Sequence, residues 1–146
     1  MTNTTYNLDC IRDCIIAIHK QFETSYNNSN LDLPPKFSWS IIYTNETLLN
    51  SYDEKTIKCS IFNLLLLGYI ESKDFNQSSR GNVTRFHINY ITPEGQTFYA
   101  MASNEKTWQK VKKEMSKQTN SYDIKMLIPV LSALVGSIAN KVLSGV

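Results

Sequence analysis

A long apolar helix that runs directly into a pair of short strands is the feature that most restricts the fold of this 146-residue chain. The segment after Asp53 keeps helical spacing as far as Gly68, which suits the left-handed position that often ends a helix. The residues that follow, GYIES, are typical of a strand, and VTRFHINYI at 83–91 alternates apolar and polar residues. The turn-forming residues between them predict a β-hairpin directly after the helix.

Helices are expected before this unit as well. Apolar residues at helical spacing predict an amphipathic helix over roughly 8–24, followed by an exposed Asn- and Pro-rich loop at 26–36. The aromatic and β-branched segment FSWSIIY at 37–43 predicts a short strand, after which Thr44 or Asn45 caps a short helix.

Helices are also expected after the hairpin. Thr92, Pro93 and Glu94 make a strong helix start, with a hydroxyl cap, a proline in the first turn and an acid beside the helix dipole. This helix is expected to bend near 103–104 and to resume through Trp108. A polar break then precedes a last helix over 123–144.

The composition narrows the class of protein. The length fits one domain with a sizeable core, and the net charge of +2 with a pI near 8.4 lacks the strongest mark of a nucleic-acid binder. The basic residues are nevertheless concentrated in the second half of the hairpin and at 106–117. The polar start of the chain shows no signal peptide, so we expect a cytoplasmic protein with free thiols at Cys10, Cys14 and Cys59.

Residues that would carry catalysis or hold a metal are not arranged in a recognisable motif. Cys10 and Cys14 lie four residues apart without a second CxxC pair, and His19 and His87 accompany no nucleophile motif. We therefore expect no catalytic residue, no metal, no cofactor and no enzymatic activity.

Three stretches carry a resemblance to a known fold: LLLLGYIES, the turn NQSSRGN and the exit INYITPEGQTFY. Together they resemble winged helix-turn-helix proteins, with Ile91 in place of the leucine of the family's leucine-threonine-x-x-glycine exit. The resemblance implies an α+β fold of three helices and a hairpin wing, with additional C-terminal helices. It divides the chain into a winged-helix domain at 1–118 and an amphipathic helix at 119–146, used for packing or oligomerisation.

The beginning NLDCIRDCIIAIHK and the exit ITPEGQTFYAMASNEKTWQKVKKEM also resemble a narrower group. They are similar to the small phage-associated and bacterial proteins of domain of unknown function 2513 and the related YjcQ family. This resemblance implies a winged-helix fold and a phage or prophage setting, and it implies no reaction.

In a winged helix that binds DNA, the third helix enters the major groove and the wing contacts phosphates. The polar and basic residues in these positions are the candidate nucleic-acid contacts, and Asn63 among them has the amide needed for a bidentate contact with adenine. They are Lys55, Thr56, Lys58, Asn63, Lys73, Arg80 and Arg85.

The same helix also argues for protein binding. At 100 degrees per residue, Cys59, Phe62 and Leu66 fall around Lys55, opposite the core face, and Asp53 and Glu54 add carboxylates at the helix start. Neighbouring helices either bury this apolar stripe or leave it as a protein-binding or self-association surface.

The last helix has an uncharged stretch at 126–140, shorter than the 20 or so residues that span a bilayer. We expect it to pack on the domain or to form a homodimer, and reversible binding to a membrane surface is the less favoured alternative because the polar face has few cations. The stripe that would make this contact consists of Leu127, Leu131, Leu134 and Ile138.

The sequence thus predicts a small non-enzymatic binding protein, with DNA-linked regulation as the leading function. The alternative is a winged helix that occupies and inhibits a host protein, with no DNA binding.

Overall fold

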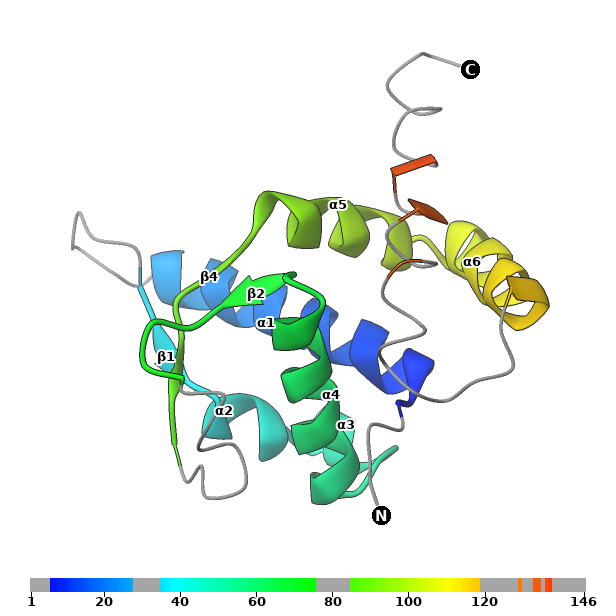
Figure 1. The fold of residues 1–146 in the computed structure, drawn as a ribbon. Helices are drawn as coiled ribbons and strands as arrows, with labels where there is room; N and C mark the ends of the chain where they lie inside the picture. The colour runs from blue at the N-terminus through cyan, green and yellow to red at the C-terminus, as the bar shows by residue number, and fades with distance from the viewer. Residues whose placement is uncertain are drawn as a thin grey trace.

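The structure is a computed structural model, and the part of the chain that it describes is 6–27, 35–75, 85–118 and the isolated positions 129, 133–134 and 136–137. Within that part, helices dominate and the strands are short (Figure 1). The fold is a mixed α+β arrangement with small antiparallel sheets, as the sequence predicts.

Helix α1, Leu8–Asn27, runs through the middle of the molecule and confirms the predicted first helix. Its inner face buries residues at helical spacing, including Cys10, Cys14 and Ile18. Asn7 accepts a hydrogen bond from the backbone N–H of Cys10 at 3.0 Å, which satisfies one of the free donors at the helix start. Because α1 contacts both α4 and α5, it is the element on which the rest of the domain assembles.

The segment 37–43 differs from its sequence prediction. Only Phe37–Ser38 form a strand, β1, and Ser40–Tyr43 form a short helix, α2. The helical turn buries Trp39 and Ile42 three residues apart on one side, whereas a continuous strand would point them to opposite faces. Core packing therefore overrides the strand preference of aromatic and β-branched residues, and the predicted strand is wrong beyond Ser38.

Helices α3, Glu46–Leu49, and α4, Glu54–Leu66, begin at side-chain caps. Asn45 accepts from the N–H of Leu48 at 3.1 Å, and Asp53 accepts from the N–H of Thr56 at 2.8 Å. Gly68 follows α4 with a φ of +77°, a conformation that costs a residue with a side chain about 1–2 kcal/mol. The predicted cap at Asn45, the predicted helix start after Asp53 and the predicted glycine stop are confirmed.

The strands form two antiparallel pairs. Strand β2, Ile70–Glu71, pairs with β4, Tyr90–Ile91, as expected for the hairpin. Strand β3, His87–Ile88, pairs instead with β1, with Phe37 opposite Ile88. The returning segment is therefore not one continuous strand as predicted, because it is interrupted at Asn89, and it joins the β1 segment to the hairpin.

Helices α5, Pro93–Ala102, and α6, Glu105–Gln118, follow the hairpin with the predicted break between them. Thr92 caps α5 by accepting from the N–H of Gly95 at 3.0 Å, and it donates to the carbonyl of Gly68 at 2.6 Å. Helix α6 docks through Trp108, which is fully buried and whose Nε1 donates to Asp9 of α1 at 3.0 Å.

The predicted last helix falls mostly outside the described residues. The described positions Pro129, Ala133, Leu134, Gly136 and Ser137 are helical, and Leu134 packs against the core cluster. The other members of the predicted stripe, Leu127, Leu131 and Ile138, lie outside the described residues. Within the described part, no helix combines the length and the apolar character that crossing a membrane requires.

Candidate nucleic-acid interface

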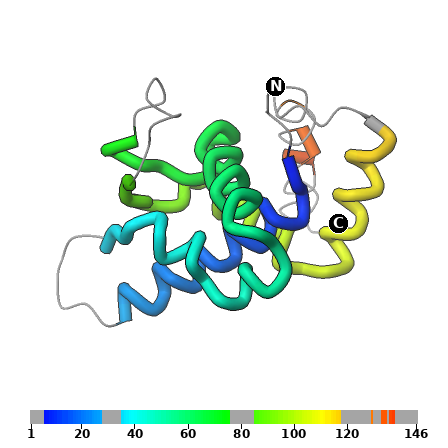
Figure 2. The backbone as a smooth tube through the Cα atoms, turned by 90° about the horizontal axis from the view of Figure 1, so that it is seen from below, coloured from blue at the N-terminus to red at the C-terminus, as the bar shows by residue number. Residues whose placement is uncertain are grey.

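Helix α4 lies between the hairpin on one side and α6 on the other (Figures 1 and 2). The tight turn at Gly68 connects α4 to β2, and the bond from Thr92 to the Gly68 carbonyl ties the returning strand to the same turn. The hairpin is thereby held in a fixed position at the C-terminal end of α4.

Three predicted phosphate contacts are exposed on these elements. Lys55 is exposed in the first turn of α4, Lys73 follows β2, and Arg85 precedes β3. Among the described residues, no carboxylate forms an ion pair with any of the three. They are therefore free to contact an external anion. Arg80, in the predicted turn of the hairpin, lies outside the described residues.

Lys58, by contrast, is already engaged. Its ammonium lies 2.9 Å from a Glu54 carboxylate oxygen and 4.4 Å from the centre of the Tyr43 ring. The hydrogen bond to Glu54 raises the pKa of Lys58, so the lysine stays charged but is partly neutralised by its neighbour. A phosphate would have to compete with Glu54 for this side chain.

Two of the predicted nucleic-acid contacts are buried or half-buried. Asn63 is only 5% exposed, which argues against the predicted contact between its amide and adenine. Thr56 is half-buried on α4, and its N–H and carbonyl oxygen are bonded to Asp53 and Ser60. The buried face of α4 is rotated toward Ser60 and Asn63, because α1 packs along that side.

Phe62 and Leu66, the predicted apolar stripe, are half-buried rather than exposed. Phe62 lies in an aromatic cluster, 5.3 Å from the Trp39 ring centre, 5.7 Å from that of Phe75 and 6.3 Å from that of Phe86. The neighbouring segments therefore cover much of this stripe, which was one of the two readings left open by the sequence. Among the described residues, the more exposed apolar side chains lie elsewhere, for example Tyr26 on α1 and Ile41 on α2.

The charge of α4 and of the described part of the hairpin is balanced. Residues 53–75 and 85–91 contain four lysines and arginines and four carboxylates, and Arg80 in the predicted turn adds one more positive charge in the sequence. The carboxylate of Asp53 is held by the cap hydrogen bond from Thr56, which lowers its pKa and keeps it charged at the start of α4. The described part of this surface offers exposed cations but no net positive charge.

Helix α6 carries an excess of positive charge. It has five lysines against two glutamates, in a chain whose total charge is only +2. The candidate residues chosen from the sequence include none of these lysines. Their recurrence at 106, 110, 113 and 117, spacings of four, three and four residues, is the signal that identifies one face of a helix.

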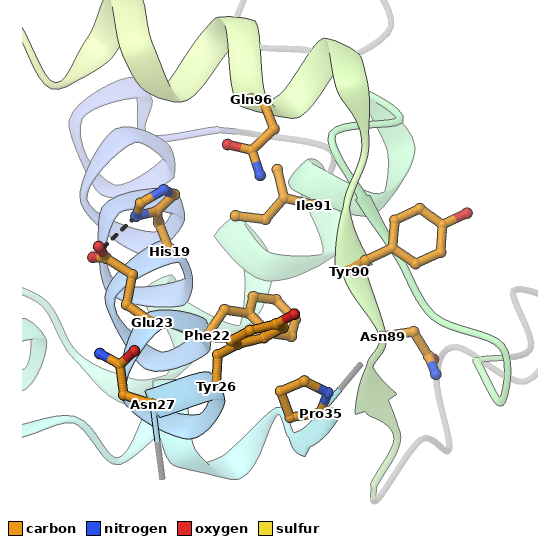
Figure 3. Close-up of a pocket in the computed structure, with 10 residues that line it drawn as sticks. All are labelled: His19, Phe22, Glu23, Tyr26, Asn27, Pro35, Asn89, Tyr90, Ile91 and Gln96. Atoms are coloured by element: carbon orange, nitrogen blue, oxygen red, sulfur yellow. Dashed lines mark ion pairs between the residues drawn. The ribbon is translucent and has the colours of Figure 1, made fainter. Parts of the chain in front are cut away.

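A pocket of about 430 Å³ lies between α1 and the returning strand (Figure 3). His19 points toward it, but its ring stacks on Tyr99 at 3.7 Å between centres and lies 3.4 Å from the carboxylate of Glu23. No serine or cysteine lines the pocket among the described residues.

The cysteines do not form a metal site with their described neighbours. No group of three or more His, Cys, Asp or Glu side chains with metal-binding geometry occurs in the described part of the chain. The sulfur atoms of Cys10 and Cys14 lie 3.9 Å apart as free thiols in the core. Their hydrogen bond and the burial raise the pKa of Cys14 well above its usual value, which keeps this thiol protonated.

The model of one family matches residues 5–121, and its description reads "Hypothetical protein (DUF2513)". The chain belongs to this family, which confirms the resemblance to domain of unknown function 2513 seen in the sequence. No curated protein and no solved structure matches the chain.

Proposed function

We propose that this protein is a winged helix-turn-helix domain that binds duplex DNA, with α4 directed at the major groove and the hairpin at the phosphate backbone. The observation that carries the proposal is the order of elements around α4. A capped helix turns at Gly68 directly into a hairpin whose returning segment also pairs with β1. This order supports the proposed winged-helix arrangement.

Exposed cations support the same function. Lys55 on α4 and Lys73 and Arg85 on the hairpin lack carboxylate partners among the described residues. Lysine and arginine contacts to phosphates position a protein on duplex DNA without reading its sequence. The burial of Asn63 leaves sequence readout to other groups, so binding is expected to depend mainly on the backbone and on DNA shape.

The test is binding to a labelled duplex of mixed sequence, followed by fluorescence anisotropy over a range of salt concentrations. The double variant Lys55→Ala with Arg85→Ala is expected to lower the magnitude of the salt slope by about two, one for each lost phosphate contact. Lys20→Ala, which removes an exposed lysine from α1, is the control and should leave the slope unchanged. Absence of binding at low salt would overturn the proposal.

Protein binding is the second candidate function, and the nearly balanced charge of α4 and the hairpin favours it. Residues 53–91 contain five lysines and arginines and four carboxylates, and the described part has half-buried apolar residues. These features suit a protein partner, for instance a host protein that a phage factor inhibits. The phage setting and the YjcQ likeness stay predictions.

Phe62→Asp is a poor test of protein binding, because Phe62 holds the aromatic cluster together. Leu66→Gln at the end of α4 is the better variant, and Leu49→Gln, on exposed α3, is its control. Capture of a defined host protein that is lost with Leu66→Gln and kept with Leu49→Gln would support this function. Equal capture by both variants would exclude α4 as the protein-binding surface.

A further inference from the structure

We infer that the exposed lysines of α6 form a second contact with the phosphate backbone of the same duplex, so that α4 binds between the hairpin and α6. This inference rests on the proposed function and extends its site to a helix beyond α4 and the hairpin. The lysine row consists of Lys106, Lys110, Lys113 and Lys117.

The packing of α6 directs this row to solvent. Trp108, Val111 and Met115 are buried and define the inner face of the helix. At about 100 degrees per residue, the lysine row is centred almost opposite these three residues. The four lysines are exposed, and they fall within about 60 degrees of one another around the helix axis. They therefore form a single outward line of positive charge.

The carboxylates near α6 leave most of this charge uncompensated. Glu105 accepts from Arg12 of α1 at 3.0 Å and from Gln109 at 2.9 Å, so it is turned toward the domain. The remaining lysine of the helix, Lys112, lies 3.2 Å from Asp9.

In the row itself, only Lys117 has a carboxylate partner among the described residues, Glu114 at 3.5 Å. Lys106, Lys110 and Lys113 therefore have no carboxylate partner in the part of the chain that the structure describes.

The fixed position of α6 makes the row usable as a binding surface. Trp108 and Lys112 both bond to Asp9, and the side-chain Nε of Arg12 donates to the Ala102 carbonyl at 3.0 Å, just before the helix. From Lys106 to Lys117 the helix rises about 16 Å, which matches the rise of about five base pairs. A docked helix therefore presents its charges at a spacing that a duplex backbone can accept.

An anionic membrane is the competing partner, and the packing disfavours it. A helix that lies on a bilayer inserts an apolar face between the headgroups. The apolar face of α6 is already used, because Trp108 and Val111 are fully buried against the domain. The outward face offers charge alone, which fits the phosphates of a nucleic acid.

The test uses the full chain and the triple variant Lys106→Gln, Lys110→Gln and Lys113→Gln. We expect the magnitude of the salt slope for duplex binding to fall by about three, and binding to weaken for all sequences alike. The corresponding triple Lys→Arg variant keeps the charge and should keep the slope. Single variants give a matched comparison, in which Lys110→Gln lowers the slope by about one and Lys20→Gln does not.

The outcomes separate this inference from the proposed function. If the parent chain binds duplex and the Gln triple variant keeps the full slope, the inference is overturned and the proposed function stands. If the parent chain does not bind duplex, both fail. Lysine-dependent binding to vesicles of anionic phospholipid, without such an effect on duplex binding, would assign the row to a membrane and would also overturn the inference.

Discussion

Thr92 and Gly95 lie three residues apart in the segment that leaves the hairpin, and each has a structural role there. Thr92 caps α5 and also donates to the carbonyl of Gly68, so one hydroxyl joins the end of α4 to the start of α5. Gly95 lies against Tyr69, where an added Cβ would overlap the Tyr69 carbonyl oxygen and come within 2.7 Å of Ile91 Cγ2. The exit signature seen in the sequence is thus a packing requirement of the hairpin.

We predict that Gly95→Ala destabilises the protein by at least about 2 kcal/mol, because backbone must move to admit the methyl group. Gly68→Ala is the matched comparison. Its Cβ meets nothing within 4 Å, and only the positive φ opposes it, for about 1–2 kcal/mol. Urea unfolding measures both values, and a Gly95→Ala variant as stable as the parent would contradict the packing described at Tyr69.

Thr92→Val tests the hydroxyl separately. The substitution keeps the shape of the side chain but removes the cap and the bond to Gly68, so a loss of about 1–2 kcal/mol is expected. Thermal unfolding that is unchanged by the substitution would show that the hydroxyl does not hold the two helices together.

At the scale of elements, the hairpin is fastened by a charged contact. Asp74 accepts from the backbone N–H of His87 and lies 2.9 Å from its ring Nδ1, and Ser72 donates to the same carboxylate at 3.0 Å. Burial by itself raises the pKa of Asp74, but these hydrogen bonds from His87 and Ser72 outweigh it and lower the pKa from 3.8 to about 2. The folded hairpin therefore favours the charged carboxylate.

This contact predicts a pH dependence. Because the pKa is lowered on folding, the stabilisation is complete above 3.8 and is lost as the pH falls toward about 2. Asp74→Asn should be less stable than the parent at neutral pH, and the difference should close over that acidic range. The free energy of unfolding of both proteins, measured across pH, checks this prediction. A stability difference that stays constant down to pH 2 would show that the charged carboxylate of Asp74 is not its cause.

The elements that the sequence predicts correctly are those set by local interactions. The caps at Asp53 and Thr92 and the turn at Gly68 depend on neighbouring backbone groups, so residue type and spacing identify them. The segment 37–43 is different, because Trp39 and Ile42 are placed by contacts with elements distant in sequence. Periodicity over seven residues does not carry that information.

The candidate site was predictable to a similar extent. The exposure of Lys55, Lys73 and Arg85 follows from their positions on a helix start and a hairpin. The burial of Asn63 was not predictable, since it depends on how far α1 wraps around α4. The Glu54–Lys58 pair, by contrast, has the four-residue spacing of a helical ion pair and could have been expected.

For the whole molecule, the predicted homodimer depends on the region after α6. The contact of Leu134 with the core shows that this region packs on the domain at one described position. We predict that the full chain has a mass in solution near twice 16.7 kDa. A chain that lacks residues 122–146 is expected to have the mass of a single chain. Light scattering after gel filtration measures both masses, and a single-chain mass for the full protein would contradict the dimer.

The most direct test of the central claim is the salt dependence of duplex DNA binding by the unmodified chain. In the described part of the chain, three cations on α4 and the hairpin and three on α6 lack a carboxylate partner. They predict about six phosphate contacts, and therefore a slope of about −5 for log K against log salt. A linear fall of that steepness is the result that the account predicts. No binding at low salt, or binding that is insensitive to salt, would contradict it.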